Sequence, residues 1–82
     1  MAFKGFVIWA VGENFFGDET AIISRCDLKT IGGANGRAER LLGDPRSYGC
    51  FKFEGIAQFE EKLEKARYEV MRDTTVEPVI AF

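Results

Sequence analysis

The side chains able to do acid–base chemistry in this sequence are carboxylates and thiols, because the chain contains no histidine. Without imidazole, the usual general base near neutral pH is missing, and so is a serine or cysteine nucleophile paired with histidine. The candidate paired carboxylates are Glu60, Glu61 and Glu64. Their positions fall on the polar side of an amphipathic helix, where solvated carboxylates catalyse little. We therefore expect a protein that is not an enzyme.

Two cysteines, Cys26 and Cys50, are the remaining candidates for reactive or metal-binding groups. Their spacing fits no metal motif, and no histidine is present to complete a ligand set. We expect no metal and no cofactor. Cysteines in a chain rich in large apolar residues are typically free, buried thiols of a reducing compartment, which favours the cytoplasm. A single disulfide is the alternative.

Glycine and arginine gather in the segment 31–37, Ile-Gly-Gly-Ala-Asn-Gly-Arg. Because several glycines disfavour a helix, we interpret this segment as a loop. A short helix over 37–42 follows, with Asn35 as a candidate N-cap and Gly43 as its stop. Backbone N–H groups in such a loop could hold a phosphate at the start of the helix.

The four residues Gly33–Gly36 resemble the GXXG loop of KH domains. In that family the loop clamps the backbone of a nucleic acid. The resemblance implies a nucleic-acid site that comprises Gly33, Gly36, Arg37 and Arg40. The two middle positions of this sequence are alanine and asparagine in place of basic residues. Nucleic-acid binding is therefore the alternative function, and a structural turn is the alternative role of the segment.

Adjacent phenylalanines, Phe15 and Phe16, stand in a predicted turn between Glu13 and Asp18-Glu19. Two neighbouring loop phenylalanines rarely both enter a core, so we expect at least one to be exposed. An exposed aromatic anchor with a charged rim is typical of a protein-binding hot spot. The alternative is that these rings cover the core beneath the loop.

Tyr68 is a second candidate contact for a partner protein. On the predicted helix it points away from the apolar stripe, close to Glu61, Lys65 and Arg72. Glu61 and Lys65 have the order that favours an i,i+4 ion pair. Outward tyrosines among charges are common in interfaces, although an exposed tyrosine with no role is the alternative.

Alternating and helical hydrophobic periods predict the elements that position these residues. Short runs of Phe, Val and Ile indicate strands over 3–11, 20–25, 49–54 and 76–82, and helices are expected over 37–42 and 56–72. A short helix is the alternative for Thr20–Arg25. The order β-β-α-β-α-β predicts one α+β domain over residues 1–82. We expect a two-layer sandwich with a mostly antiparallel four-stranded sheet and the helices on one face.

The first strand is apolar on both of its faces. Since helices on one face would leave the other face open, we expect apolar surface there for a second copy or a partner. The alternative is that this strand is central in the sheet and that the loop 12–19 folds back over it. The apolar run 5–11 is too short to span a bilayer, and we expect no association with membranes.

Net charge is −2, which disfavours a generic nucleic-acid binder. Small, motif-free α+β chains are typical of accessory proteins of bacteriophages and mobile elements, including anti-CRISPR proteins, which inhibit host machinery. Size and lack of motifs therefore predict a protein that binds a larger protein or complex. A homodimeric structural subunit is a third hypothesis.

Overall fold

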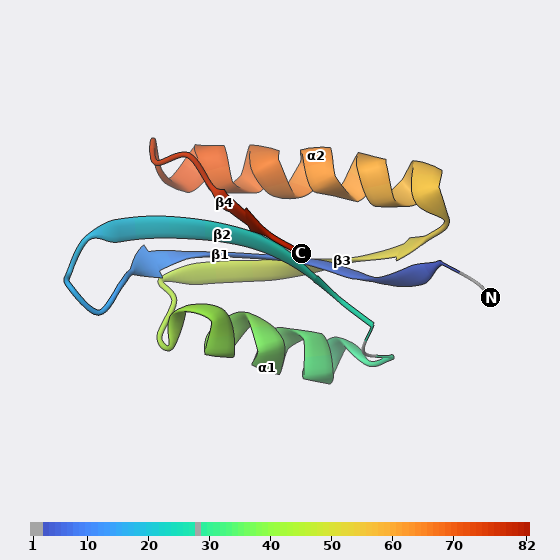
Figure 1. The fold of residues 1–82 in the computed structure, drawn as a ribbon, viewed down its shortest axis with the longest axis horizontal. Coiled ribbons are helices and arrows are strands. Elements are labelled where there is room, and N and C mark those ends of the chain that lie inside the picture. Colours follow the sequence, from blue (N-terminus) through green and yellow to red (C-terminus); the bar gives the residue numbers. More distant parts are fainter. Residues whose placement is uncertain (1–2, 28) are drawn as a thin grey trace.

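The computed structural model describes residues 3–27 and 29–82, which form four strands and two helices (Figure 1). In chain order the elements are β1 (Lys4–Glu13), β2 (Glu19–Cys26), α1 (Ile31–Leu42), β3 (Ser47–Glu54), α2 (Ile56–Asp73) and β4 (Val79–Ala81). Residues 20–25 therefore belong to a strand, and the alternative of a short helix there is wrong.

The four strands form one sheet in the order β3-β1-β2-β4. β1 pairs antiparallel with both β2 and β3, while β4 pairs parallel to β2. The expected α+β class with a mostly antiparallel four-stranded sheet is confirmed. β4 has only three residues and begins after Pro78, which fits a short edge strand because proline cannot donate a ladder hydrogen bond.

The helices lie on opposite faces of the sheet, with α2 on one side and α1 on the other (Figure 1). Val7, Trp9 and Val11 pack in the cluster that contains Ala66 and Val70 of α2. Phe6 and Ile8 pack with Ala34 and Ala38 of α1. The expectation that both helices share one face is therefore wrong, and the sheet is the middle of three layers.

This arrangement explains why both faces of β1 are apolar. Every residue from Gly5 to Gly12 is buried, because β1 has a strand on each side and a helix against each face. The expectation of an open apolar face on this strand is therefore wrong. The alternative is confirmed in that the strand is central, but it is wrong that the loop 12–19 covers it. Because helices cover both faces of β1, this strand offers no apolar surface for a second copy.

α1 begins six residues before the predicted helix start at 37. Its N-cap is Thr30, whose Oγ1 accepts a hydrogen bond from the Gly33 N–H at 3.1 Å, and not Asn35. Ala34 and Ala38, one turn apart, are fully buried against the sheet. This burial and the cap offset the poor helix propensity of the glycines. Gly43 ends the helix with φ of 76°, as predicted.

Candidate functional site

The loop between β1 and β2 projects beyond the ends of both helices (Figure 1). Its conformation is fixed by Asn14, whose Oδ1 accepts hydrogen bonds from the N–H groups of Phe16 at 2.9 Å and Asp18 at 3.0 Å. The Asn14 N–H donates to the Asp18 carbonyl at 2.8 Å. Gly17 has φ of 83°, which a residue with a side chain rarely adopts. Side-chain capping and this glycine therefore give the loop a defined shape.

Phe15 and Phe16 are displayed by this loop with exposed fractions of 97% and 83%. Their rings meet edge to face, with centroids 5.7 Å apart. The prediction of an exposed loop phenylalanine is confirmed, and the alternative that they cover the core is wrong. Glu13 and Asp18 beside them are also exposed. The tip therefore combines a bare aromatic pair with negative charge.

Tyr68 lies on the outer side of α2 and is 64% exposed. The Arg72 guanidinium lies 5.8 Å from the centre of its ring, so these two predicted residues are brought together. The expected Glu61–Lys65 ion pair is wrong. Glu61 instead contacts Lys62 at 3.0 Å, and the Lys65 ammonium lies 5.1 Å from the centre of the Phe51 ring. Lys65 is drawn toward the sheet because an aromatic face attracts a cation.

Gly33 and Gly36 lie inside α1, so the GXXG loop that resembles that of KH domains is not formed. The Gly33 N–H is already used by the N-cap, and Asn35 Oδ1 accepts from the Cys50 thiol at 3.3 Å. A backbone clamp of the kind implied by the resemblance is therefore wrong for this segment. Arg37 and Arg40 are exposed on the same helix and border an open hollow with Arg25.

The two thiols are free and lie on the α1 side of the sheet. Burial, with a smaller contribution from nearby Cys26, raises the pKa of the Cys50 thiol to about 11. A thiol with this pKa is almost fully protonated at neutral pH and is a poor nucleophile. Glu60, Glu61 and Glu64 are exposed on α2, as expected from the sequence.

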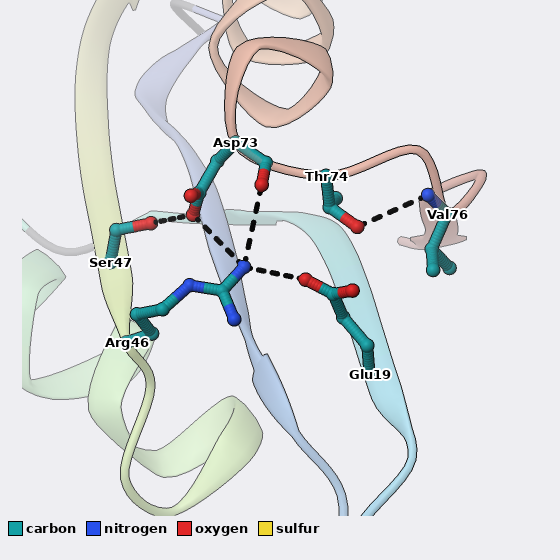
Figure 2. Close-up of polar contacts among 6 residues, drawn as sticks. All are labelled: Glu19, Arg46, Ser47, Asp73, Thr74 and Val76. Carbon is teal, nitrogen blue, oxygen red and sulfur yellow. Dashed lines mark hydrogen bonds and ion pairs between the residues drawn. The ribbon is translucent and has the colours of Figure 1, made fainter.

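A polar network that the sequence analysis did not predict joins three elements (Figure 2). Arg46 contacts Glu19 of β2 at 2.6 Å and the Asp73 carboxylate at the end of α2 at 3.5 Å. Its guanidinium also donates to the Asp73 carbonyl at 3.4 Å, and Ser47 donates to the Asp73 carboxylate. The hydrogen bond from Arg46 lowers the pKa of Glu19, and Glu19 in turn raises the pKa of Arg46. We assign this network a structural role because each charged group in it contacts a group of opposite charge.

Residues 3–27 and 29–82 contain no cluster of side chains that could hold a metal ion, and no helix among them is long and apolar enough to cross a membrane. No protein-family model, curated protein or solved structure matches this chain. The side chains themselves are therefore the basis for any statement about function.

Proposed function

We propose that this protein is a non-enzymatic binding module that engages a partner protein through Phe15 and Phe16. The observation that supports the proposal is the exposure of both rings, 97% and 83%, on a loop that projects from the fold. Large aromatic side chains provide much of the contact area in protein interfaces. Truncation of a single hot-spot aromatic often costs about 2 kcal/mol or more of binding free energy. Exposing two of them to water has a cost that a binding role would explain.

The shape and charge of the tip indicate the chemistry of the partner. Asn14 holds the loop in one conformation through its hydrogen bonds to the Phe16 and Asp18 N–H groups, so little ordering is required on binding. Exposed Glu13 and Asp18 flank the rings. The complementary surface is an apolar pocket with basic residues at its rim.

We further propose that binding occludes a functional surface of a larger complex in the cytoplasm, as an inhibitory accessory protein of a phage or mobile element would do. Two free thiols fit a reducing compartment. A chain of 82 residues is small compared with the complexes such proteins block. A projecting aromatic pair would allow it to attach through a small contact area. Tyr68 with Arg72 is a second contact under this proposal.

The test is capture of partners from a bacterial lysate by the tagged protein, with and without nuclease, followed by measurement of affinity for the protein recovered. We expect Phe15→Ala/Phe16→Ala to weaken that affinity by about 2 kcal/mol or more. Thermal stability should stay within about 0.5 kcal/mol, because these rings contact little besides each other. Tyr68→Ala, which removes a 64% exposed aromatic on α2, tests the second contact separately from the tip.

Two outcomes would contradict the proposal. One is unchanged affinity of the double variant for every recovered protein. The other is a monodisperse dimer in light scattering that the double variant leaves intact, which would favour the hypothesis of a homodimeric structural subunit. A dimer abolished by Phe15→Ala/Phe16→Ala would instead identify the partner as a second copy.

A further inference from the structure

Two open hollows lie beside the segment that joins β2 to α1. This segment is at the end of the molecule opposite the loop between β1 and β2 (Figure 1). One, of about 180 Å³, is lined by Lys4, Lys29 and Lys52 around buried Phe6. The other, of about 440 Å³, is lined by three arginines. Asp27 lines both hollows, and we call their combined lining the basic surface.

The charge of the basic surface is opposite to that of the rest of the chain. Six basic side chains line it, namely Lys4, Arg25, Lys29, Arg37, Arg40 and Lys52. Only two carboxylates, Asp27 and Glu54, join them, which gives a local net charge of six minus two, or +4. The remaining five basic and eleven acidic side chains carry −6, which together give the total of −2. The net charge of −2 for the whole chain therefore does not reveal this locally positive region.

Each of the five basic side chains outside this surface contacts a carboxylate or an aromatic ring. Arg46, Lys62, Arg67 and Arg72 each contact a carboxylate within 4 Å, and Lys65 lies over Phe51. On the basic surface, Lys52 contacts Glu54 and Arg25 contacts Asp27. The Arg25 guanidinium also lies 4.6 Å from the centre of the Phe3 ring, on the α2 side of the sheet, so it adds little to the positive charge beside α1. Among the described residues, Lys4, Lys29, Arg37 and Arg40 have no carboxylate within that distance. Four cations that line open hollows and form no direct ion pair attract an anion.

We propose that the basic surface binds the phosphate backbone of a nucleic acid. The six cations come from β1, β2, the segment before α1, α1 itself and β3, and spread over two hollows instead of converging on one point. A chain of phosphates fits that distribution better than a single small anion. Arg37 and Arg40 can each hold a phosphate through two N–H groups.

Binding at this surface is independent of base sequence. The aromatic side chain that lines it, Phe6, is 5% exposed, so it offers no ring on which a base could stack. This site differs from the predicted loop at Gly33–Gly36, because side-chain cations from several elements and not backbone N–H groups make the contacts. It is also separate from the hairpin tip, so the two proposals can fail independently.

The experiment is fluorescence anisotropy of the full chain with a labelled single-stranded DNA of about 20 nucleotides, over about 20–200 mM NaCl. With about four phosphates neutralised, log K should fall with log[salt] at a slope near −2.8. Arg37→Gln/Arg40→Gln should weaken binding about tenfold or more and reduce the slope by about 1.4. Lys62→Gln/Arg67→Gln on α2 removes the same charge from ion-paired positions and should change affinity less than about twofold.

Absence of salt-sensitive binding by the unaltered protein would overturn the proposal, as would an equal loss in the α2 control. Competition by polyglutamate as strong as that by unlabelled DNA would also overturn it, because the ligand would then be an acidic protein. If Arg37→Gln/Arg40→Gln lowers the melting temperature, Lys4→Gln/Lys29→Gln provides the second variant. It changes two cations outside α1 and should give the same loss.

Discussion

Packing lowers the reactivity of the Cys50 thiol. Its thiol sits between the sheet and α1, donates to Asn35 Oδ1 at 3.3 Å and has a pKa of about 11, which burial raises. The ordinary value for such a thiol is 9.0. The same contacts that stabilise the α1 side of the core therefore keep the sulfur protonated.

We expect alkylation of Cys50 by iodoacetamide to be slow at pH 8 and to accelerate up to about pH 11. Only the thiolate attacks, and the folded protein holds little of it below the raised pKa. The measurement is mass spectrometry of the modified peptide against pH. The chain unfolded in urea provides the control, in which the rate should level off near the ordinary pKa. Equal rates for the folded and unfolded chains would show that the thiol is not protected.

At the scale of single elements, α1 is a helix that its own sequence disfavours. Gly32 and Gly36 have φ values outside the left-handed region, and a Cβ at either position would meet nothing closer than 3.9 Å. Gly32→Ala and Gly36→Ala should therefore each raise the free energy of unfolding by about 0.5–1 kcal/mol. Urea denaturation, followed by the fluorescence of Trp9, measures this change.

Gly49→Ala is the matched control for those substitutions. Gly49 lies opposite Trp9 on the neighbouring strand, and a Cβ there would come within 2.6 Å of the indole Nε1. We expect a loss of about 1–3 kcal/mol because the buried indole must move. The same chemical change therefore has opposite signs in the two elements, and destabilisation by the α1 alanines would contradict the assigned helix.

The hydrophobic periodicity of the sequence predicted the strands and α2. It did not predict which face of the sheet each helix covers. The apolar residues of β1 show that both faces are buried, yet they cannot tell whether a helix, a loop or another chain covers each face. The second half of α1 was predicted, but residues 31–36 were missed because three glycines outweighed the available signal, which was Thr30 as N-cap with Ala34 and Ala38 one turn apart. Tertiary packing overrides local propensity in such a helix.

The candidate sites were predictable to different degrees. Phe15 and Phe16 are adjacent in the chain, so their exposure on a turn follows from local sequence. The convergence of Lys4, Lys29 and Lys52 depends on strand register and on the path into α1, neither of which a local pattern contains. The contacts of Arg46 with Glu19 and Asp73 likewise join positions distant in sequence.

At the scale of the whole molecule, the Arg46 network ties β2 to the end of α2 and makes stability depend on pH (Figure 2). The pKa of Glu19 is lowered from 4.5 in the folded protein, first by its hydrogen bond with Arg46. The unfolded chain therefore binds the proton more readily. The stabilisation by Glu19 is present above about pH 4.5 and is lost as the pH falls through the folded-state pKa.

We expect Glu19→Gln to lower the melting temperature at pH 7, with a difference from the unaltered protein that shrinks as the pH falls below about 4.5 and through the lowered pKa of Glu19. Differential scanning calorimetry at pH 7 and below about pH 4.5 measures the difference. Glu64→Gln, which removes an exposed carboxylate outside the network, is the control. A Glu19→Gln difference that is constant with pH would show that the carboxylate charge contributes nothing.

The central place of β1 also has a consequence for hydrogen exchange. Its backbone pairs with β2 on one side and β3 on the other, and a helix covers each face. Its amide protons can reach solvent only when the sheet separates, so they should exchange last, at the rate of global unfolding. Those of β4, a three-residue strand at the edge, should exchange far earlier. The chain therefore has a gradient of protection that runs from its first strand to its last.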